Sequence, residues 1–197
     1  MSNPLKGHYH PVIKLPDDYE VYDFSKGYDP ERTLRCEYGI GKYGEKRPNM
    51  YRGELFEKER RDIHIGIDIA APVGTPVYSF APGKVFLYGN NDNPFDYGPT
   101  IITEHILNGT VIYALHGHLS LESLEHIQSI HSFSKGTILG FVGSKIVNGG
   151  WNPHLHFQLS KQKPLSYDMP GVVHESQLSN ALETYPDPRL VLGMLYE

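Results

Sequence analysis

The stretch Ile63-His64-Ile65-Gly66-Ile67-Asp68-Ile69 alternates strictly between two kinds of residue. Each odd position is isoleucine, and each even position is polar or glycine. Successive side chains of a β-strand point to opposite faces, so the pattern predicts a strand whose isoleucines all face the core. The β-branched residues and the central glycine argue against a helix. We therefore expect His64 and Asp68 to share the other face, with Gly66 leaving space between them for an ion.

The same alternation returns in His154-Leu155-His156-Phe157-Gln158-Leu159. The three apolar side chains are expected on one face of a strand, and the polar ones on the other. Two imidazoles two residues apart on one face are a natural arrangement at a metal site. Gln158 shares the face of His156, where it is either a solvated side chain or a hydrogen-bond partner of that histidine.

A third run, Val111 to Ser120, contains His116 and His118. The two histidines share a face if the strand continues that far, although Gly117 can bend it. Zinc binds imidazole and carboxylate ligands in a tetrahedral site, and a catalytic zinc keeps one position open for water. Two histidines and one aspartate leave that position open. Iron or manganese also fits such a ligand set.

These residues resemble the lysostaphin-type zinc metallopeptidases, a family of peptidoglycan endopeptidases. The resemblance spans roughly residues 61–160, and its motifs occur in the family's order. They are His64-Ile-Gly-Ile-Asp68 with its continuation to Val77, Ala81-Pro-Gly83-Lys-Val85, Tyr97-Gly98, Ile101-Ile102, His118-Leu-Ser and Pro153-His154-Leu-His156-Phe. The family fold consists of antiparallel sheets with a groove across the metal.

The resemblance also implies a role for each site residue. It makes His64, Asp68 and His156 the zinc ligands. It makes His118 and His154 the catalytic histidines, and His116 is a weaker candidate for the role of His118. The implied reaction is zinc-assisted hydrolysis of an amide bond. One catalytic histidine takes a proton from water and the other hydrogen-bonds the developing oxyanion; the sequence leaves open which does which.

The rest of the chain predicts a mostly β fold, in which antiparallel sheets form a groove over the metal site. Short apolar-alternating runs separated by Gly, Pro and Asn favour this class. One or two short helices are expected, at Ser120–Ile130 and near Ser176–Glu183. Residues 1–60 are interpreted as an extended N-terminal arm and lead-in structure packed on the core, 61–160 as the metallopeptidase-like core, and 161–197 as a wrapping tail.

Three segments depart from the family's usual pattern and should line the groove. They are Asn90–Pro99, Glu125–Lys135 and Asn148–Pro153. Trp151, the single tryptophan, is either a groove wall that stacks on a substrate or a brace for its loop. The loops bear on the identity of the substrate more than on the chemistry.

Composition narrows the classes of function. The chain has 197 residues, 39% of them apolar, 21% charged, and a net charge of −5, which fits a globular domain and gives no reason to expect nucleic-acid binding. The single cysteine, Cys36, allows no internal disulfide and no cysteine zinc cluster. The N-terminal residues lack the apolar segment of a secretory signal, and no apolar stretch is long enough for a membrane span. A cytoplasmic location is therefore expected, with export by another route as the open alternative.

Three functions follow from this pattern. The first is a zinc peptidase acting on a peptide crosslink of the peptidoglycan type. The second is a non-catalytic module that binds a partner in the groove, and the third is a cytoplasmic zinc hydrolase acting on a different bond. The presence of every implied ligand and catalytic histidine favours an enzyme.

Overall fold

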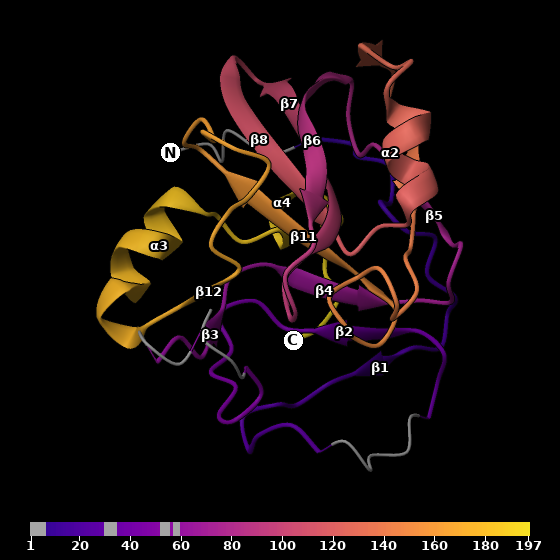
Figure 1. Ribbon diagram of the computed structural model, residues 1–197. Helices are drawn as coiled ribbons and strands as arrows, with labels where there is room; N and C mark the ends of the chain where they lie inside the picture. Colours follow the sequence, from indigo (N-terminus) through magenta and orange to yellow (C-terminus); the bar gives the residue numbers. More distant parts are fainter. Residues whose placement is uncertain (1–6, 30–34, 52–55, 57–59) are drawn as a thin grey trace.

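A computed structural model describes residues 7–29, 35–51, 56 and 60–197, and a large β-sheet forms its centre (Figure 1). The strands of this sheet are β1 (Glu20–Val21), β2 (Gly39–Gly41), β4 (Ile67–Ala70), β6 (Gly83–Asn91), β7 (Gly98–Leu107), β8 (Thr110–Gly117), β9 (Ser132–Phe133) and β11 (His154–Ser160). Two small sheets pair β5 (Pro76–Tyr78) with β10 (Ile138–Phe141) and β3 (Ile63–His64) with β12 (Val172–Val173).

The spatial order of the main sheet is β1-β2-β4-β11-β8-β7-β6-β9. Its neighbouring strands run antiparallel, except that β1 and β2 are parallel. The predicted mostly β, antiparallel fold is confirmed. The order places β4 beside β11 and β11 beside β8, so the three motifs singled out in the sequence lie on adjacent strands.

The helices of the described residues are short. They are α2 (Leu121–Ile127), the 3-10 helix η1 (Glu175–Gln177), α3 (Leu178–Thr184) and α4 (Arg189–Leu192). Ser120 is the N-cap of α2, as expected, although its hydroxyl meets that of Ser123 at 3.0 Å instead of capping a backbone N–H. The second expected helix appears as η1 and α3. Helix α4 was not predicted, because four residues are too few to show a helical period.

The stretch from Ile63 to Ile69 is not one strand, which corrects the prediction. Gly66 has a φ of +136°, a conformation outside the β region, and it separates β3 from β4. Ile67 and Ile69 belong to the main core. Ile63 and Ile65 instead pack with Val173 and Ala181 in a separate small cluster. The alternation therefore identifies buried isoleucines correctly but hides the bend that divides them between two clusters.

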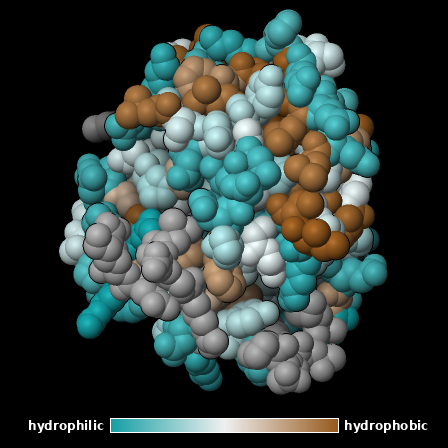
Figure 2. Space-filling model, in the orientation of Figure 1, coloured by the Kyte–Doolittle hydropathy of each residue, from teal (hydrophilic) through white to brown (hydrophobic). Residues whose placement is uncertain are grey.

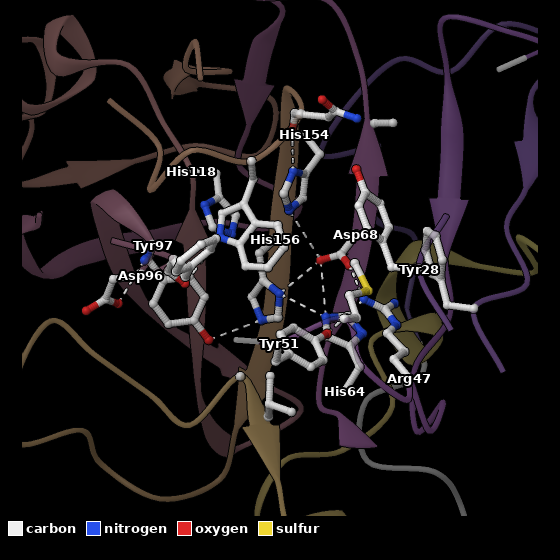
Figure 3. A pocket seen from close by; sticks show the side chains of 18 of the residues that line it. Tyr28, Arg47, Tyr51, His64, Asp68, Asp96, Tyr97, His118, His154 and His156 are labelled. Carbon is white, nitrogen blue, oxygen red and sulfur yellow. Dashed lines mark hydrogen bonds and ion pairs between the residues drawn. The ribbon is translucent and has the colours of Figure 1, made fainter. Parts of the chain in front are cut away.

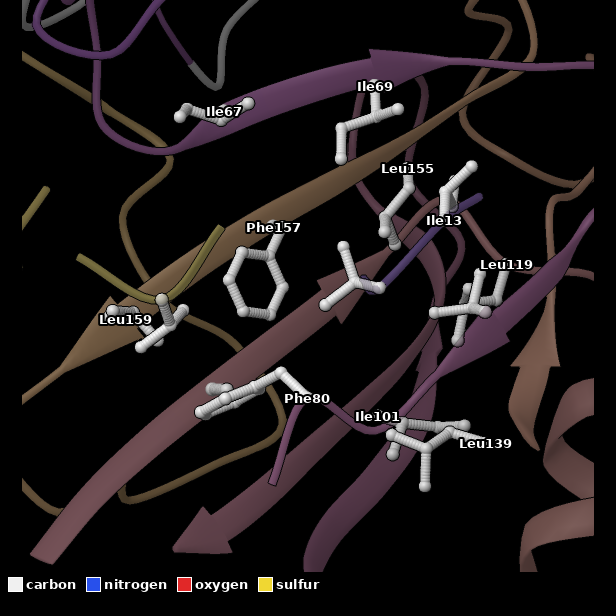
Figure 4. Packing of buried hydrophobic residues seen from close by; sticks show 14 of the residues in the cluster. Ile13, Ile67, Ile69, Phe80, Ile101, Leu119, Leu139, Leu155, Phe157 and Leu159 are labelled. Carbon is white, nitrogen blue, oxygen red and sulfur yellow. The ribbon is translucent and has the colours of Figure 1, made fainter. Parts of the chain in front are cut away.

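The main core lies under β4 and β11 (Figure 4). Ile67, Leu155 and Phe157 point into it, and the Phe157 ring meets Phe80 edge-on at 5.8 Å. Full burial of each such side chain contributes about 1.5–3 kcal/mol. One face of both strands is thereby fixed in the core, so the alternate residues, which include Asp68 and His156, face away from it.

Both ends of the described chain pack on this core. Val12 and Ile13 are buried, and the Tyr78 N–H donates to the Val12 carbonyl at 2.8 Å. At the other end, the Tyr19 hydroxyl donates to the Leu195 carbonyl at 3.0 Å. On the face seen in Figure 2, apolar residues form separate patches among hydrophilic ones. None of the helices in the described ranges has the length and apolar character to cross a bilayer.

Candidate metal centre

Three side-chain donors meet at one face of β4 and β11 (Figure 3). The His64 Nε2 lies 3.1 Å from the His156 Nδ1 and 3.2 Å from the Asp68 Oδ1, and the Asp68 Oδ1 lies 3.1 Å from the His156 Nδ1. The three atoms form a nearly equilateral triangle. They come from the residues that the sequence identified as a ligand set.

The triangle fits a tetrahedral zinc ion. Zinc–nitrogen and zinc–oxygen bonds of about 2.0–2.1 Å at tetrahedral angles place neighbouring donors about 3.3 Å apart. The donor separations in the structure are within a few tenths of an ångström of that value. Two neutral imidazoles and one carboxylate are also the donor types that zinc prefers. The residues present therefore fit the metal that the sequence implied.

The register of the sheet brings the donors together. Asp68 and His156 are direct cross-strand partners in the β4–β11 pair. His64 reaches the same point from β3, beyond the bend at Gly66. A Cβ atom on Gly66 would lie 2.6 Å from the Cε1 and Nε2 of His156. The space that the sequence assigned to an ion beside Gly66 is thus taken by the His156 ring.

The outer nitrogen of each histidine in the triangle has a hydrogen-bond partner. The Nδ1–H of His64 donates to the Lys42 carbonyl at 3.0 Å, and the Nε2–H of His156 donates to the Gln158 Oε1 at 3.0 Å. Such partners fix the tautomer, so that the inner nitrogen presents a lone pair to the metal. Gln158 is 1% exposed. Its interpretation as a solvated side chain is wrong, and its interpretation as a partner of His156 is confirmed.

The amide of Gln158 is itself oriented by the C-terminal tail. Its Nε2 donates to the Pro170 carbonyl at 3.4 Å. A carbonyl can only accept, so the amide nitrogen faces Pro170 and the amide oxygen faces His156. The tail also supplies β12, which pairs with the ligand-bearing β3.

Arg47 is a site residue that the sequence analysis did not find. Its side chain is 1% exposed, and its Nη1 lies 2.7 Å from the Oδ2 of Asp68. Burial favours the neutral form of Asp68, but its interaction with the His64 ring and the positive charge of Arg47 outweigh this effect and hold the pKa of the carboxyl well below its usual range. Arg47 lies in a segment without hydrophobic periodicity, so no pattern marked it.

His118 and His154 lie together beside the donor triangle. Their ring centroids are 4.3 Å apart, and the Nε2 of His154 is 3.7 Å from the Asp68 Oδ1. Each ring donates its Nδ1–H to a backbone carbonyl, His118 to Asn148 at 3.0 Å and His154 to Asn152 at 2.6 Å. Burial lowers the pKa of both imidazoles, so both are neutral at pH 7. In that state, each Nε2 can accept a proton.

The structure places His118 and His116 in different environments. Strand β8 ends at Gly117, and His118 adopts a left-handed backbone conformation with a φ of +62° that turns it toward the cleft. His116 is fully buried against Phe157 in the core, where burial lowers its pKa to about 3. The two histidines would have shared a face only if the strand had continued to His118; it ends at Gly117, and they lie on different faces.

A cleft of about 520 Å³ opens over the metal centre. Two of the three predicted segments line it, through Phe95 and Asp96 on one and Trp151 on the other. The third, Glu125–Lys135, contributes no residue to the lining, so that part of the prediction is wrong. The indole N–H of Trp151 also donates to the Phe95 carbonyl at 3.2 Å, so this residue both lines the cleft and joins the two loops. The N-terminal segment adds a wall that the sequence did not foresee. It consists of Tyr22, Phe24, Tyr28 and Tyr51.

The sequence of residues 62–167 matches the model of peptidase family M23. This match covers more than half of the chain. The chain belongs to peptidase family M23. The resemblance to lysostaphin-type peptidases noted in the sequence is thereby confirmed.

The M23 chain is similar to proteins from two bacteria. It is 38% identical over 96 residues to the DD-carboxypeptidase/endopeptidase Mpg of Neisseria meningitidis serogroup B, an alignment that covers 49% of the chain and 20% of that protein. It is 36% identical over 95 residues to the cell division protein DipM of Caulobacter vibrioides, covering 48% of the chain and 14% of that protein. The M23 chain thus spans a fifth or less of the length of these relatives.

A solved structure supports the fold. The M23 chain matches the catalytic domain of the antimicrobial peptidase lysostaphin from Staphylococcus simulans with a TM-score of 0.50 and 24% identity. The match covers 80% of the chain and 93% of that domain. At this level of identity, the likeness shows a shared architecture.

Proposed function

We propose that this M23 chain is a zinc peptidase that hydrolyses an amide bond in a peptide crosslink of the peptidoglycan type. The observation that carries the proposal is the donor triangle of His64, Asp68 and His156, with two neutral histidines beside it and a cleft above it. A non-catalytic binding module would not need the paired histidines next to the donors.

The chain's own residues supply most of the proposed chemistry. His64, Asp68 and His156 would hold zinc, whose Lewis acidity polarises the scissile carbonyl and promotes ionisation of water. His118 and His154 each present an Nε2 that can take a proton from the attacking water and return it to the leaving amine. Their backbone hydrogen bonds keep that nitrogen unprotonated and fix each ring in place.

The cleft offers aromatic and acidic contacts to a peptide chain. Aromatic rings line it, among them Tyr28, Trp151 and Phe95, together with carboxylates of Asp96 and Asp168. Burial and the neighbouring Asp96 raise the pKa of Asp168 to about 6. We infer that substrate contacts come from these loops and from the N-terminal wall. The names of the bacterial relatives support the choice of peptidoglycan peptides as the first substrates to test.

The test combines metal analysis with a substrate screen. Zinc content is measured on the purified protein and on His64→Ala and His156→Ala, and each protein is then incubated with crosslinked muropeptides and with unrelated peptides. We expect about one zinc per native chain, loss of zinc in both variants, and cleavage of crosslinked muropeptides by the native protein alone.

Other outcomes identify the alternatives. No bound zinc after zinc is supplied would overturn the enzyme proposal and leave a groove-binding module. Bound zinc with cleavage of other amides but no cleavage of muropeptides would assign the chain to a different substrate class.

A further inference from the structure

We infer that Arg47 is a positioning residue that makes Asp68 a monodentate metal ligand. This inference rests on the proposed metal site. Arg47 lies outside the residues that match the family model, in the segment before the first ligand. It approaches Asp68 from the side away from His156 (Figure 3).

The two oxygens of Asp68 have separate partners. Oδ1 lies 3.1 Å from the His156 Nδ1 and 3.2 Å from the His64 Nε2, as part of the donor triangle. Oδ2 accepts a hydrogen bond from the Arg47 Nη1 at 2.7 Å. A charge-assisted hydrogen bond of this length is among the strong ones in proteins, so it holds Oδ2 away from the metal.

Arg47 is itself fixed on every side. Its Nε donates to Glu45 at 3.0 Å, its Nη1 to the Tyr51 hydroxyl at 3.0 Å, and its Nη2 to the Lys42 carbonyl at 3.2 Å. Its guanidinium carbon lies 5.0 Å from the ring centre of Phe24. A guanidinium held by these three hydrogen bonds does not turn to follow Asp68, so Asp68 must conform to it.

The sheet makes room for the guanidinium beside the carboxylate. Gly41 is the cross-strand partner of Asp68 on β2, as His156 is on β11. A Cβ atom at Gly41 would lie 2.8 Å from the Arg47 Nη2. Arginine thus occupies the space that a side chain at position 41 would fill, on the flank of Asp68 opposite to His156.

The Lys42 carbonyl links this support to a second ligand. It accepts from the Arg47 Nη2 and from the His64 Nδ1. One backbone oxygen therefore helps to orient two members of the donor triangle. The lead-in segment from Gly41 to Arg47 acts as an outer frame of the metal centre.

A free carboxylate can bind a metal through one oxygen or through both. With Oδ2 held by Arg47, the proposed site keeps three protein donors, which leaves a coordination position for substrate or water. Without Arg47, Oδ2 is free to join the metal and fill that position. The inference therefore predicts a change in coordination number and not only a loss of stability.

The test uses cobalt(II) in place of zinc, because its visible absorption is strong in four-coordinate sites and weaker at higher coordination. We compare the native protein with two variants. Arg47→Lys keeps the positive charge but lacks the planar guanidinium group with its several N–H donors. In the double variant Arg47→Met/Glu45→Gln, the second substitution ensures that Glu45 is not left as a carboxylate without its arginine partner. The matched control is Arg35→Met, which removes an exposed arginine. Circular dichroism and thermal melting establish that each protein is folded.

We expect weaker cobalt absorption in both Arg47 variants, together with zinc affinity reduced 10- to 100-fold in chelator competition. The control should match the native protein. Native-like spectra and affinities in the Arg47 variants would overturn the inference about Arg47 but not the proposed metal site. Weaker zinc binding with an unchanged cobalt spectrum would also overturn it, because it would assign Arg47 a structural role alone. Failure of the native protein to bind either metal would instead reject the proposed function.

Discussion

The imidazole of His118 lies against that of His154, with ring centroids 4.3 Å apart and planes inclined by 42°. They come from different segments, one directly after β8 and the other at the start of β11. Each is anchored through Nδ1 to a backbone carbonyl. The pair presents two proton-accepting nitrogens beside the metal centre without placing either residue in the donor triangle.

Removing either of these histidines should slow catalysis strongly but leave metal binding intact. We expect His118→Ala and His154→Ala to keep about one zinc per chain and to lower kcat/KM on a crosslinked peptide by about 10²–10⁴-fold, the usual contribution of a general acid or base. Zinc analysis and peptide cleavage measure the two effects. His131→Ala, at an exposed histidine, is the control. Loss of zinc in either variant would contradict the division of roles.

The contact between His156 and Gln158 should govern metal affinity. Gln158→Met removes the acceptor for the His156 Nε2–H and should weaken zinc binding about 10- to 100-fold. Gln158→Glu keeps an acceptor oxygen and should retain much of the affinity. The exposed Gln128→Met is the matched control. Equal affinities for Gln158→Met and native protein, measured by chelator competition, would show that the tautomer does not depend on this bond.

Gly66 should tolerate no side chain, for two separable reasons. An alanine there has an unfavourable positive φ, and its Cβ would lie 2.6 Å from the His156 ring. Gly74 also has a positive φ, but a Cβ there would have open space around it. We expect Gly74→Ala to lose about 1 kcal/mol of stability and to bind zinc normally. Gly66→Ala should lose zinc binding as well, and normal zinc binding by it would contradict the assigned steric role.

Two core histidines should make the metal-free protein sensitive to acid. Burial lowers the pKa of His105 to about 4 and that of His116 to about 3, from 6.5. Below pH 6.5, the unfolded chain binds protons that the folded chain excludes, so stability falls as the pH decreases toward 4. Each group accounts for roughly 2 kcal/mol between pH 7 and pH 5.

Urea unfolding in the presence of a chelator measures this dependence. His116→Leu removes one of the two groups and should reduce the loss of stability between pH 7 and pH 5. His131→Leu, at an exposed position, should leave the slope unchanged. An equally steep slope in His116→Leu would mean that His116 titrates normally in the folded protein.

The sequence patterns predicted the faces of the strands but not their register. The alternation in Ile63–Ile69 and His154–Leu159 separated the apolar side chains from the polar ones, and the family resemblance then selected His64, Asp68 and His156 as the donors. No single strand could reveal that Asp68 and His156 are direct partners, because pairing is set by the whole sheet. The division of the chain at residues 60 and 160 and the cytoplasmic location stay predictions.

The residues that the sequence did not reveal act through tertiary contacts. Arg47 lies in an irregular segment and gains its role only when β2 pairs with β4. The resemblance favoured His118 over His116, but the left-handed backbone at His118 that turns this residue toward the cleft had no signal in the sequence. Such features have no periodic signature, so they become visible only in three dimensions.

The pairing of Asp68 with His156 gives the bound metal a mechanical role. These donors are 88 residues apart in sequence but directly opposite in the sheet. An ion bound by both is a reversible crosslink between β4 and β11, and it closes a long loop of the chain as a disulfide would. Free zinc should then raise the melting temperature in proportion to the logarithm of its concentration, so thermal protection can serve as a titration of the site independent of any substrate.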